Sequence, residues 1–337
     1  MSETFTATST DEYIPVIDLT GARSGDPDER TAVASAIDAV CRESGFLVVT
    51  GHGIDPELID RIHGTTIELF AQPDEWKAQY DCAPESPALR GFFRTASNVS
   101  AAEDVTTAPD LCELFTMSRL GEPGIGERAG LGDAIDLWGA PNVWPDRPAD
   151  LRDVWLEYYV AMEALATDLL RLFAIGLGLD EHHFDDKVDE HITNLTANFY
   201  PPIDVAPLAD QYRKGPHSDW GSLTILFQDG VGGLEVVDRR TGGWIDVPVI
   251  PGAYVVNIGD LMARWTNDEW NSTKHRVRVP AAEKRSVPRV SIPFFHHPNW
   301  DTMIECLPSC QSPDNPPKYE PVTAGAYLLA KVNAAYT

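Results

Sequence analysis

Residues 216–238 read PHSDWGSLTILFQDGVGGLEVVD, and this stretch carries the clearest information about the fold. It contains two short β-rich runs, SLTILFQD (222–229) and GLEVVD (233–238), with Gly232 and Gly233 at the junction. Short strand-like runs separated by glycine are typical of antiparallel strands joined by tight turns. The stretch therefore predicts two short strands joined by a tight turn.

The same rhythm extends in both directions, from about residue 191 to residue 295. The further runs are TNLTANFY, GWIDVPV, AYVVNIGD, KHRVRVP and PRVSIPFF, with Gly, Pro and Asp between them. Many short strands with turn signals between them indicate an antiparallel barrel or jelly roll. We therefore predict a mainly β protein with flanking helices and a jelly-roll core.

The segments outside this core predict a mixture of helices, strands and loops. YIPVIDL (13–19) and GFLVVTGHGI (45–54) read as strands, whereas residues 29–44 and 56–72 have helical apolar spacing. Residues 84–150 are rich in Pro, Gly and Asp without strong periodicity, which indicates long loops of the kind that often shape a binding site.

We expect four parts along the chain. A long helical stripe at 153–179 marks a supporting helix. The parts are an N-terminal mixed α/β region (13–150), the supporting helix with a linker (151–190), the jelly-roll catalytic core (191–311) and a C-terminal helix (312–337).

Composition narrows the class of partner. The 337 residues include 26 basic and 52 acidic side chains, for a formal net charge of -26, which repels nucleic-acid phosphates and anionic bilayers. The polar N-terminus does not resemble a signal peptide, and no apolar run is long enough to span a membrane. The five cysteines show no CxxC spacing. We expect a cytoplasmic protein that binds neither nucleic acid nor membranes.

A candidate metal site begins with His217 and Asp219. Side chains at i and i+2 of an extended strand project from the same face, so both can reach one ion. Fe(II) oxygenases use two imidazoles and one carboxylate and leave positions open for co-substrate and oxygen. His275 is the best third candidate, because a jelly roll brings distant strands together, although His296 and His297 remain alternatives.

A second His-x-Asp pattern occurs at His183 and Asp185. It lies in the polar stretch DEHHFDDKVDE, just beyond the long helical stripe. Such a charged stretch is typical of a solvated helix end. We expect no metal there.

Several ordered motifs resemble a known family. NFYPP, HSDWGSLTILFQDGVGGLEV, VIPGAYVVNIGDLMARWTND, STKHRVRVP and PRVSIPFFHHP are similar, in order and spacing, to the isopenicillin N synthase-like branch of the 2-oxoglutarate and Fe(II)-dependent dioxygenases. N-terminal motifs extend the similarity over residues 13–311. The resemblance implies a double-stranded β-helix core, with His217, Asp219 and His275 as the iron ligands.

The resemblance also implies residues for the co-substrate. Arg289 and Ser291 match the family's Arg-x-Ser pair, which grips the distal carboxylate of 2-oxoglutarate. Tyr200 matches a tyrosine that contacts the co-substrate in relatives, and Asn198 precedes it at the same two-residue spacing. Thr196 stands where the family usually has an arginine, which leaves that part of the pocket open.

Substrate contacts are expected at two places. Phe295 matches an aromatic position that touches the substrate in some relatives. The region 84–118, including Phe92, Arg94 and Phe115, is expected to help cap the pocket, because a jelly roll leaves one end open. Core packing is the alternative role for these aromatic side chains.

The resemblance implies an oxygenase that uses O2 and 2-oxoglutarate to oxidise a small organic molecule, in specialised metabolism. Hydroxylation is the default reaction, with desaturation and ring closure as other outcomes. One alternative is an Fe(II) oxidase of the same fold that needs no 2-oxoglutarate, and another is a non-oxidative jelly-roll binding protein or isomerase. The set of His217, Asp219, His275 and Arg289 favours the oxygenase.

Overall fold

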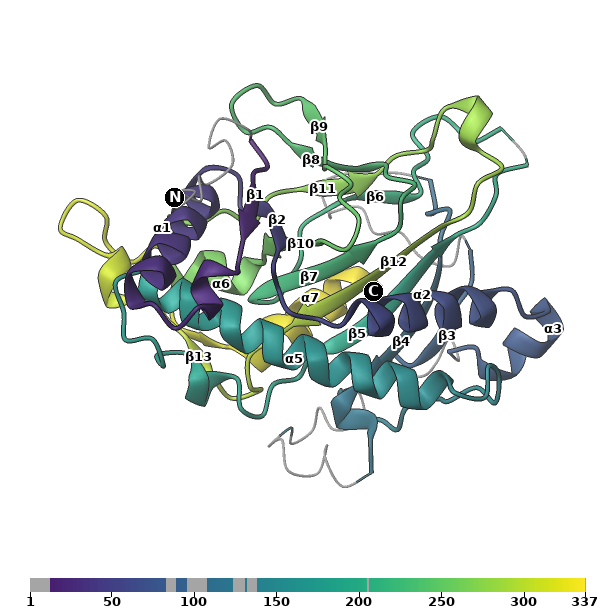
Figure 1. Ribbon diagram of the computed structural model, residues 1–337, viewed down its shortest axis with the longest axis horizontal. Coiled ribbons are helices and arrows are strands. Elements are labelled where there is room, and N and C mark those ends of the chain that lie inside the picture. Colours follow the sequence, from purple (N-terminus) through teal and green to yellow (C-terminus); the bar gives the residue numbers. More distant parts are fainter. Residues whose placement is uncertain are drawn as a thin grey trace, which may run out of the picture.

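Two β-sheets form the centre of the molecule, with long helices packed along the larger one (Figure 1). The computed structural model describes residues 13–82, 89–95, 108–123, 131, 138–204 and 206–336. None of the helices in these segments is long and apolar enough to cross a membrane.

The larger sheet has eight strands, and the sheet that faces it has four. In spatial order the larger sheet contains β1 (Val16–Asp18), β2 (Phe46–Thr50), β10 (Tyr254–Ile258), β7 (Leu223–Gln228), β12 (Arg289–His296), β5 (Asn194–Tyr200), β4 (Glu113–Ser118) and β3 (Gly91–Phe93). The smaller sheet contains β6 (Lys214–His217), β11 (His275–Val277), β8 (Leu234–Val237) and β9 (Trp244–Asp246). A separate pair joins β13 (Met303–Ile304) to β14 (Val322–Thr323). The predicted jelly roll is confirmed.

The larger sheet combines strands from distant parts of the chain. β1 runs parallel to β2, and β2 pairs antiparallel with β10 of the predicted core. At the opposite edge, β3 and β4 extend the sheet beyond β5. Segments from 13–150 and from 191–311 therefore share one hydrogen-bonded sheet.

The helices begin where local capping signals place them. In α1 (Pro27–Glu43) and α2 (Pro56–Phe70), an aspartate accepts a hydrogen bond from the backbone N–H two residues later, and proline follows at the first helical position. The predicted supporting helix is observed as α5 (Leu151–Gly176), which packs against α1, α2 and the larger sheet.

Shorter helical segments complete the fold. The α-helices are α3 (Asp74–Lys77), α6 (Asp260–Trp265) and α7 (Ala324–Tyr336). The 3-10 segments are η1 (Gly21–Arg23), η2 (Ala78–Tyr80), η3 (Arg119–Gly121), η6 (Asp185–Lys187), η7 (Ala282–Lys284) and η8 (Pro308–Cys310).

Strand alternation separates the two faces of the larger sheet. Along β5, Leu195 and Ala197 join the hydrophobic cluster beneath the helices. Tyr200 belongs to a second cluster that also contains Val236 and Val277 of the smaller sheet. Side chains on the Tyr200 face of β5 therefore point into the space between the sheets.

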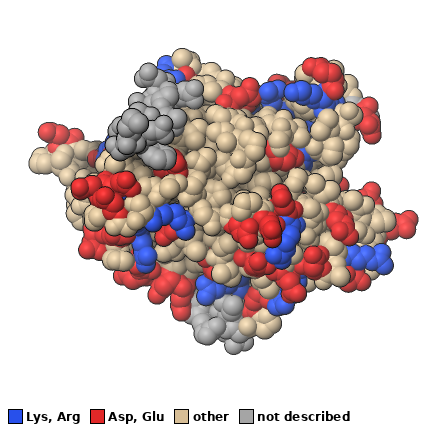
Figure 2. Space-filling view, viewed as in Figure 1, with Lys and Arg blue, Asp and Glu red and all other residues tan. Residues whose placement is uncertain are grey.

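Acidic side chains are spread widely over the outside of the molecule. Figure 2 shows them across one face, with basic groups gathered in smaller clusters among them. This distribution agrees with the net charge of -26.

The packing of α5 can be tested with two neighbouring substitutions. Met162 is fully buried against the core, whereas Val160 is 62% exposed. Met162→Ala should lower the free energy of unfolding by about 2–5 kcal/mol, because it removes buried methylene groups and leaves a cavity. Val160→Ala should change it by less than about 0.5 kcal/mol. Denaturant unfolding followed by circular dichroism measures both, and equal effects would contradict the observed orientation of the helix.

Candidate metal centre and co-substrate pocket

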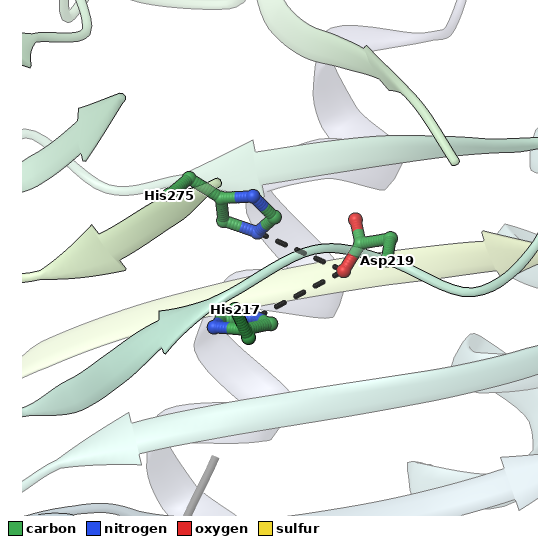
Figure 3. Close-up of side chains that lie close together, drawn as sticks. All are labelled: His217, Asp219 and His275. Atoms are coloured by element: carbon green, nitrogen blue, oxygen red, sulfur yellow. Dashed lines mark ion pairs between the residues drawn. The ribbon is translucent and has the colours of Figure 1, made fainter. Parts of the chain in front are cut away.

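His217, Asp219 and His275 meet between the two sheets (Figure 3). His217 ends β6 and His275 begins β11, and the two residues lie directly opposite each other in the antiparallel register. Asp219 follows β6 in the connection to β7. Its Oδ1 lies 3.9 Å from Nε2 of His217 and 3.7 Å from Nε2 of His275. Three donor atoms within 4.8 Å of one another fit a single metal ion.

Hydrogen bonds orient each of these side chains. Asp219 Oδ2 accepts from Thr224 Oγ1 at 2.6 Å and from Asn257 Nδ2 at 2.7 Å, which leaves Oδ1 toward the imidazoles. His217 Nδ1 lies 2.7 Å from the carbonyl oxygen of Gly215. A proton on Nδ1 satisfies that contact and leaves the Nε2 lone pair for a metal. His275 Nδ1 faces a backbone carbonyl in the same way, at 3.3 Å.

The electrostatics of the site favour the protonation states that a metal requires. Burial lowers the pKa of His217 to about 3, helped by the neighbouring His275 and Lys214. Burial opposes ionisation of Asp219, yet the two imidazoles and the hydrogen bonds from Asn257 and Thr224 outweigh it and hold the pKa of that carboxyl below its usual range. The site therefore presents a neutral imidazole at His217 and an ionised carboxylate.

The loop that carries Asp219 is held by close backbone packing. A Cβ on Gly221 would lie 2.3 Å from the carbonyl oxygen of His296, and one on Gly259 would lie 2.2 Å from the carbonyl oxygen of Gly221. The N–H of Asp260 donates to the carbonyl oxygen of Asp219 at 2.8 Å. Glycine is therefore required at both positions, because a side chain at Gly221 would push the carboxylate loop away from the end of β12 and one at Gly259 would push it away from the start of α6.

The four predicted co-substrate residues form two cross-strand pairs. Arg289 on β12 lies opposite Tyr200 on β5, and Ser291 lies opposite Asn198. Arg289 is 1% exposed, and its Nη1 donates to Ser291 Oγ at 3.2 Å. Its guanidinium carbon lies 4.9 Å from the centre of the Tyr200 ring. The structure thus brings all four residues together.

The Arg289 guanidinium meets the requirement for binding a carboxylate. In the described part of the chain no carboxylate lies within 4.0 Å of it, and its Nε has no hydrogen-bond partner. Its other contact is a 3.4 Å hydrogen bond from Nη2 to Gln228 Oε1. A buried guanidinium with unused hydrogen-bond donors can bind a carboxylate ligand through two parallel hydrogen bonds.

Some residues of the site were not predicted from the sequence. Thr224 and Asn257 orient Asp219 from β7 and β10, and no local pattern distinguishes them from other strand residues. Arg213 is 1% exposed, and Lys214 donates from Nζ to Asn198 Oδ1 at 3.2 Å. The available signal for this basic pair is its place at the start of the strand that carries His217, where Arg213 directly precedes β6 and Lys214 begins it.

The predicted substrate residues lie in two different environments. Phe295 pairs with Thr224 of β7 and with Asn194 of β5, which places it on the strand segment beside the metal centre. Phe92 and Phe115 pack against each other in the hydrophobic cluster beneath the helices, and the Phe115 ring also meets Trp155 of α5. These contacts correspond to core packing rather than to a position beside the metal.

The surroundings of Arg94 and of the expected cap differ from both of these environments. Arg94 donates from Nε to Asp81 Oδ1 at 2.6 Å, and its guanidinium carbon lies 5.5 Å from the Phe92 ring centre. Much of the expected cap, at 83–88 and 96–107, lies outside the described residues.

The other histidine candidates have different partners. Asp185 accepts from Arg171 Nη2 at 2.8 Å, so the second His-x-Asp pattern contains a surface ion pair. His296 Nδ1 lies 2.8 Å from Ser222 Oγ. Burial lowers the pKa of His297 to about 4. Within the described segments, one group of three or more His, Cys, Asp or Glu side chains is close enough to hold a metal ion, and it consists of His217, Asp219 and His275.

Comparisons with known proteins agree with this geometry. Residues 192–298 match the 2OG-Fe(II) oxygenase superfamily, and residues 14–147 match the family described as non-haem dioxygenase in morphine synthesis N-terminal. The chain is 34% identical over 330 residues to the 2-oxoglutarate-Fe(II) type oxidoreductase hxnY of Emericella nidulans, covering 93% of this chain and 89% of that protein. It is 33% identical to validamycin A dioxygenase of Streptomyces hygroscopicus subsp. limoneus, covering 84% and 76%.

A solved structure extends the agreement to the whole fold. A full-length Neurospora crassa protein, crystallised in complex with alpha-KG (2-oxoglutarate) and thymine, is 30% identical, with a TM-score of 0.83 over 97% of this chain and 99% of that chain. The predicted double-stranded β-helix is confirmed by this match. The chain therefore belongs to the 2OG-Fe(II) oxygenase superfamily and is an enzyme that depends on Fe(II) and 2-oxoglutarate.

Proposed function

We propose that this enzyme hydroxylates a small organic molecule of specialised metabolism, with iron held by His217, Asp219 and His275. The observation that carries the proposal is the convergence of these three donor atoms within 4.8 Å, in the same barrel as the partly satisfied guanidinium of Arg289. Validamycin A dioxygenase, named for a small molecule, supports the substrate class. Hydroxylation is the simplest outcome, because it requires only one C–H bond to be held beside the metal.

Each part of the site has a role in binding or positioning. Bound Fe(II) supplies the redox chemistry that couples oxidative decarboxylation of 2-oxoglutarate to oxidation of the substrate. Thr224 and Asn257 hold one oxygen of Asp219, so that the other faces the metal position. Arg289 and Ser291 bind the distal carboxylate of 2-oxoglutarate and thereby fix its orientation.

The position of Phe295 supports a role in binding the substrate. Its strand neighbour Thr224 donates to Asp219, so a flat aromatic wall lies close to the carboxylate ligand. We propose that Phe295 contacts the substrate, whereas Phe92 and Phe115 stabilise the core. Arg94 forms an ion pair with Asp81.

Removal of any one iron ligand should abolish tight iron binding. His217→Ala, Asp219→Ala and His275→Ala should each lose the metal, because a three-ligand site cannot spare a donor. Iron content after anaerobic loading and gel filtration measures the effect. His183→Ala is the control and should retain iron. Full occupancy in His275→Ala would direct attention to His296 and His297 as ligands.

Loss of the planar, bidentate guanidinium of Arg289 should weaken binding of 2-oxoglutarate without affecting binding of iron. In Arg289→Lys the charge remains but the bidentate geometry is lost, at a cost of about 1.5–3 kcal/mol, or roughly ten- to 150-fold in the dissociation constant of 2-oxoglutarate. Iron content should stay unchanged. Anaerobic titration of the iron-loaded protein measures the affinity, and succinate release measures turnover. Unchanged 2-oxoglutarate affinity would refute the role given to Arg289.

A further inference from the structure

A second buried arginine, Arg213, lies against the same tyrosine ring as Arg289. Arg213 directly precedes β6 and, like Arg289, is 1% exposed. Its guanidinium carbon lies 5.9 Å from the centre of the Tyr200 ring, against 4.9 Å for Arg289. The pKa of Arg213 is lowered mainly by burial and also by the nearby positive charge of Arg289. Two guanidinium groups therefore contact one tyrosine ring and act on each other through space.

The described residues do not supply an acid to pair with Arg213. No carboxylate among them lies within 4.0 Å of its guanidinium, whose hydrogen bond runs from Nη2 to the carbonyl oxygen of Val287 at 2.9 Å. Asp229 attracts Arg213 electrostatically, but its two carboxylate oxygens accept from the backbone N–H groups of Val231 and Val290. The Nε of Arg213 has no partner within the described part of the chain.

This arrangement is unfavourable without a bound anion. An arginine does not lose its proton in a protein, so neither charge can be removed by titration. A buried charge without a partner is strongly destabilising, and two neighbouring charges of the same sign add mutual repulsion. Each of the two arginines that contact Tyr200 also has an Nε without a partner among the described residues. A carboxylate bound beside this pair would relieve the repulsion and satisfy the free donors.

We propose that Arg213 is a second anchor for the distal carboxylate of 2-oxoglutarate, so that the pocket holds this group with two arginines instead of one. The inference rests on the proposed role of Arg289 and extends it. The two-arginine clamp, Arg213 and Arg289, makes the site selective for 2-oxo acids that carry a second carboxylate. A purely structural Arg213, holding the chain at Val287, would have no such selectivity.

The test compares two probes that differ only at the distal end. 2-Oxopentanoate has a methyl group where 2-oxoglutarate has its distal carboxylate. Both are titrated anaerobically into the iron-loaded protein and into Arg213→Gln. We expect Arg213→Gln to weaken 2-oxoglutarate binding by about tenfold or more, as for loss of a charged hydrogen bond, and to leave 2-oxopentanoate binding within about twofold.

A surface arginine provides the matched control. Arg278 forms ion pairs with Glu235 and Asp246 and is partly exposed. Arg278→Gln removes the same charge and should leave both dissociation constants unchanged. If Arg213→Gln weakens both probes equally, or neither, the clamp is refuted and Arg213 is structural.

Two further variants make the result decisive. If Arg213→Gln does not fold, Arg213→Lys takes its place, with an expected selective loss of roughly threefold because the planar fork is gone. An unchanged selectivity ratio in the Lys variant would overturn the proposal.

Arg289→Gln separates the hypothesis about Arg213 from the hypothesis about Arg289. If it binds 2-oxoglutarate normally while Arg213→Gln does not, the role of Arg289 fails and Arg213 remains an anchor.

Discussion

The two oxygens of Asp219 are held differently, and the metal centre depends on that difference. Thr224 and Asn257, on two strands of the larger sheet, donate to Oδ2, whereas Oδ1 faces the imidazoles of the smaller sheet. One carboxylate thus joins the sheet that carries the proposed co-substrate residues to the sheet that carries the histidines. Without the two donors the carboxylate could rotate, and the geometry of three ligands on one side of an ion would be lost.

Local sequence patterns predicted most of the fold, because each strand is defined by its own apolar alternation and by the turns beside it. The i and i+2 spacing predicted that His217 and Asp219 converge, and they do, but β6 ends at His217, so Asp219 is positioned by the connection to β7 and not by strand alternation. The choice of His275 over His296 and His297 was not available from spacing. It follows from the register of β11 against β6, in which His275 lies opposite His217.

The features that the sequence did not reveal depend on contacts between distant segments. The position of β2 beside β10 has no local signal, because pairing partners are chosen by the assembled sheet. Phe115 was expected near the pocket, but its parity on β4 turns it toward Trp155 and the helices. The roles of Asn257 and Arg213 could not be predicted either, because their neighbours in space are far away in the chain.

β12 carries the proposed co-substrate and substrate residues on a single face. Arg289, Ser291 and Phe295 alternate with the core residues Val290, Ile292 and Phe294. From Arg289 to Phe295 there are six residue steps of about 3.3 Å, so the strand sets a separation of roughly 20 Å between the proposed co-substrate anchor and the proposed substrate contact. A substitution at Phe295 would leave the arginine in place. Insertion or deletion of one residue between them would turn the arginine or the phenylalanine into the core, because side chains alternate between the two faces of a strand.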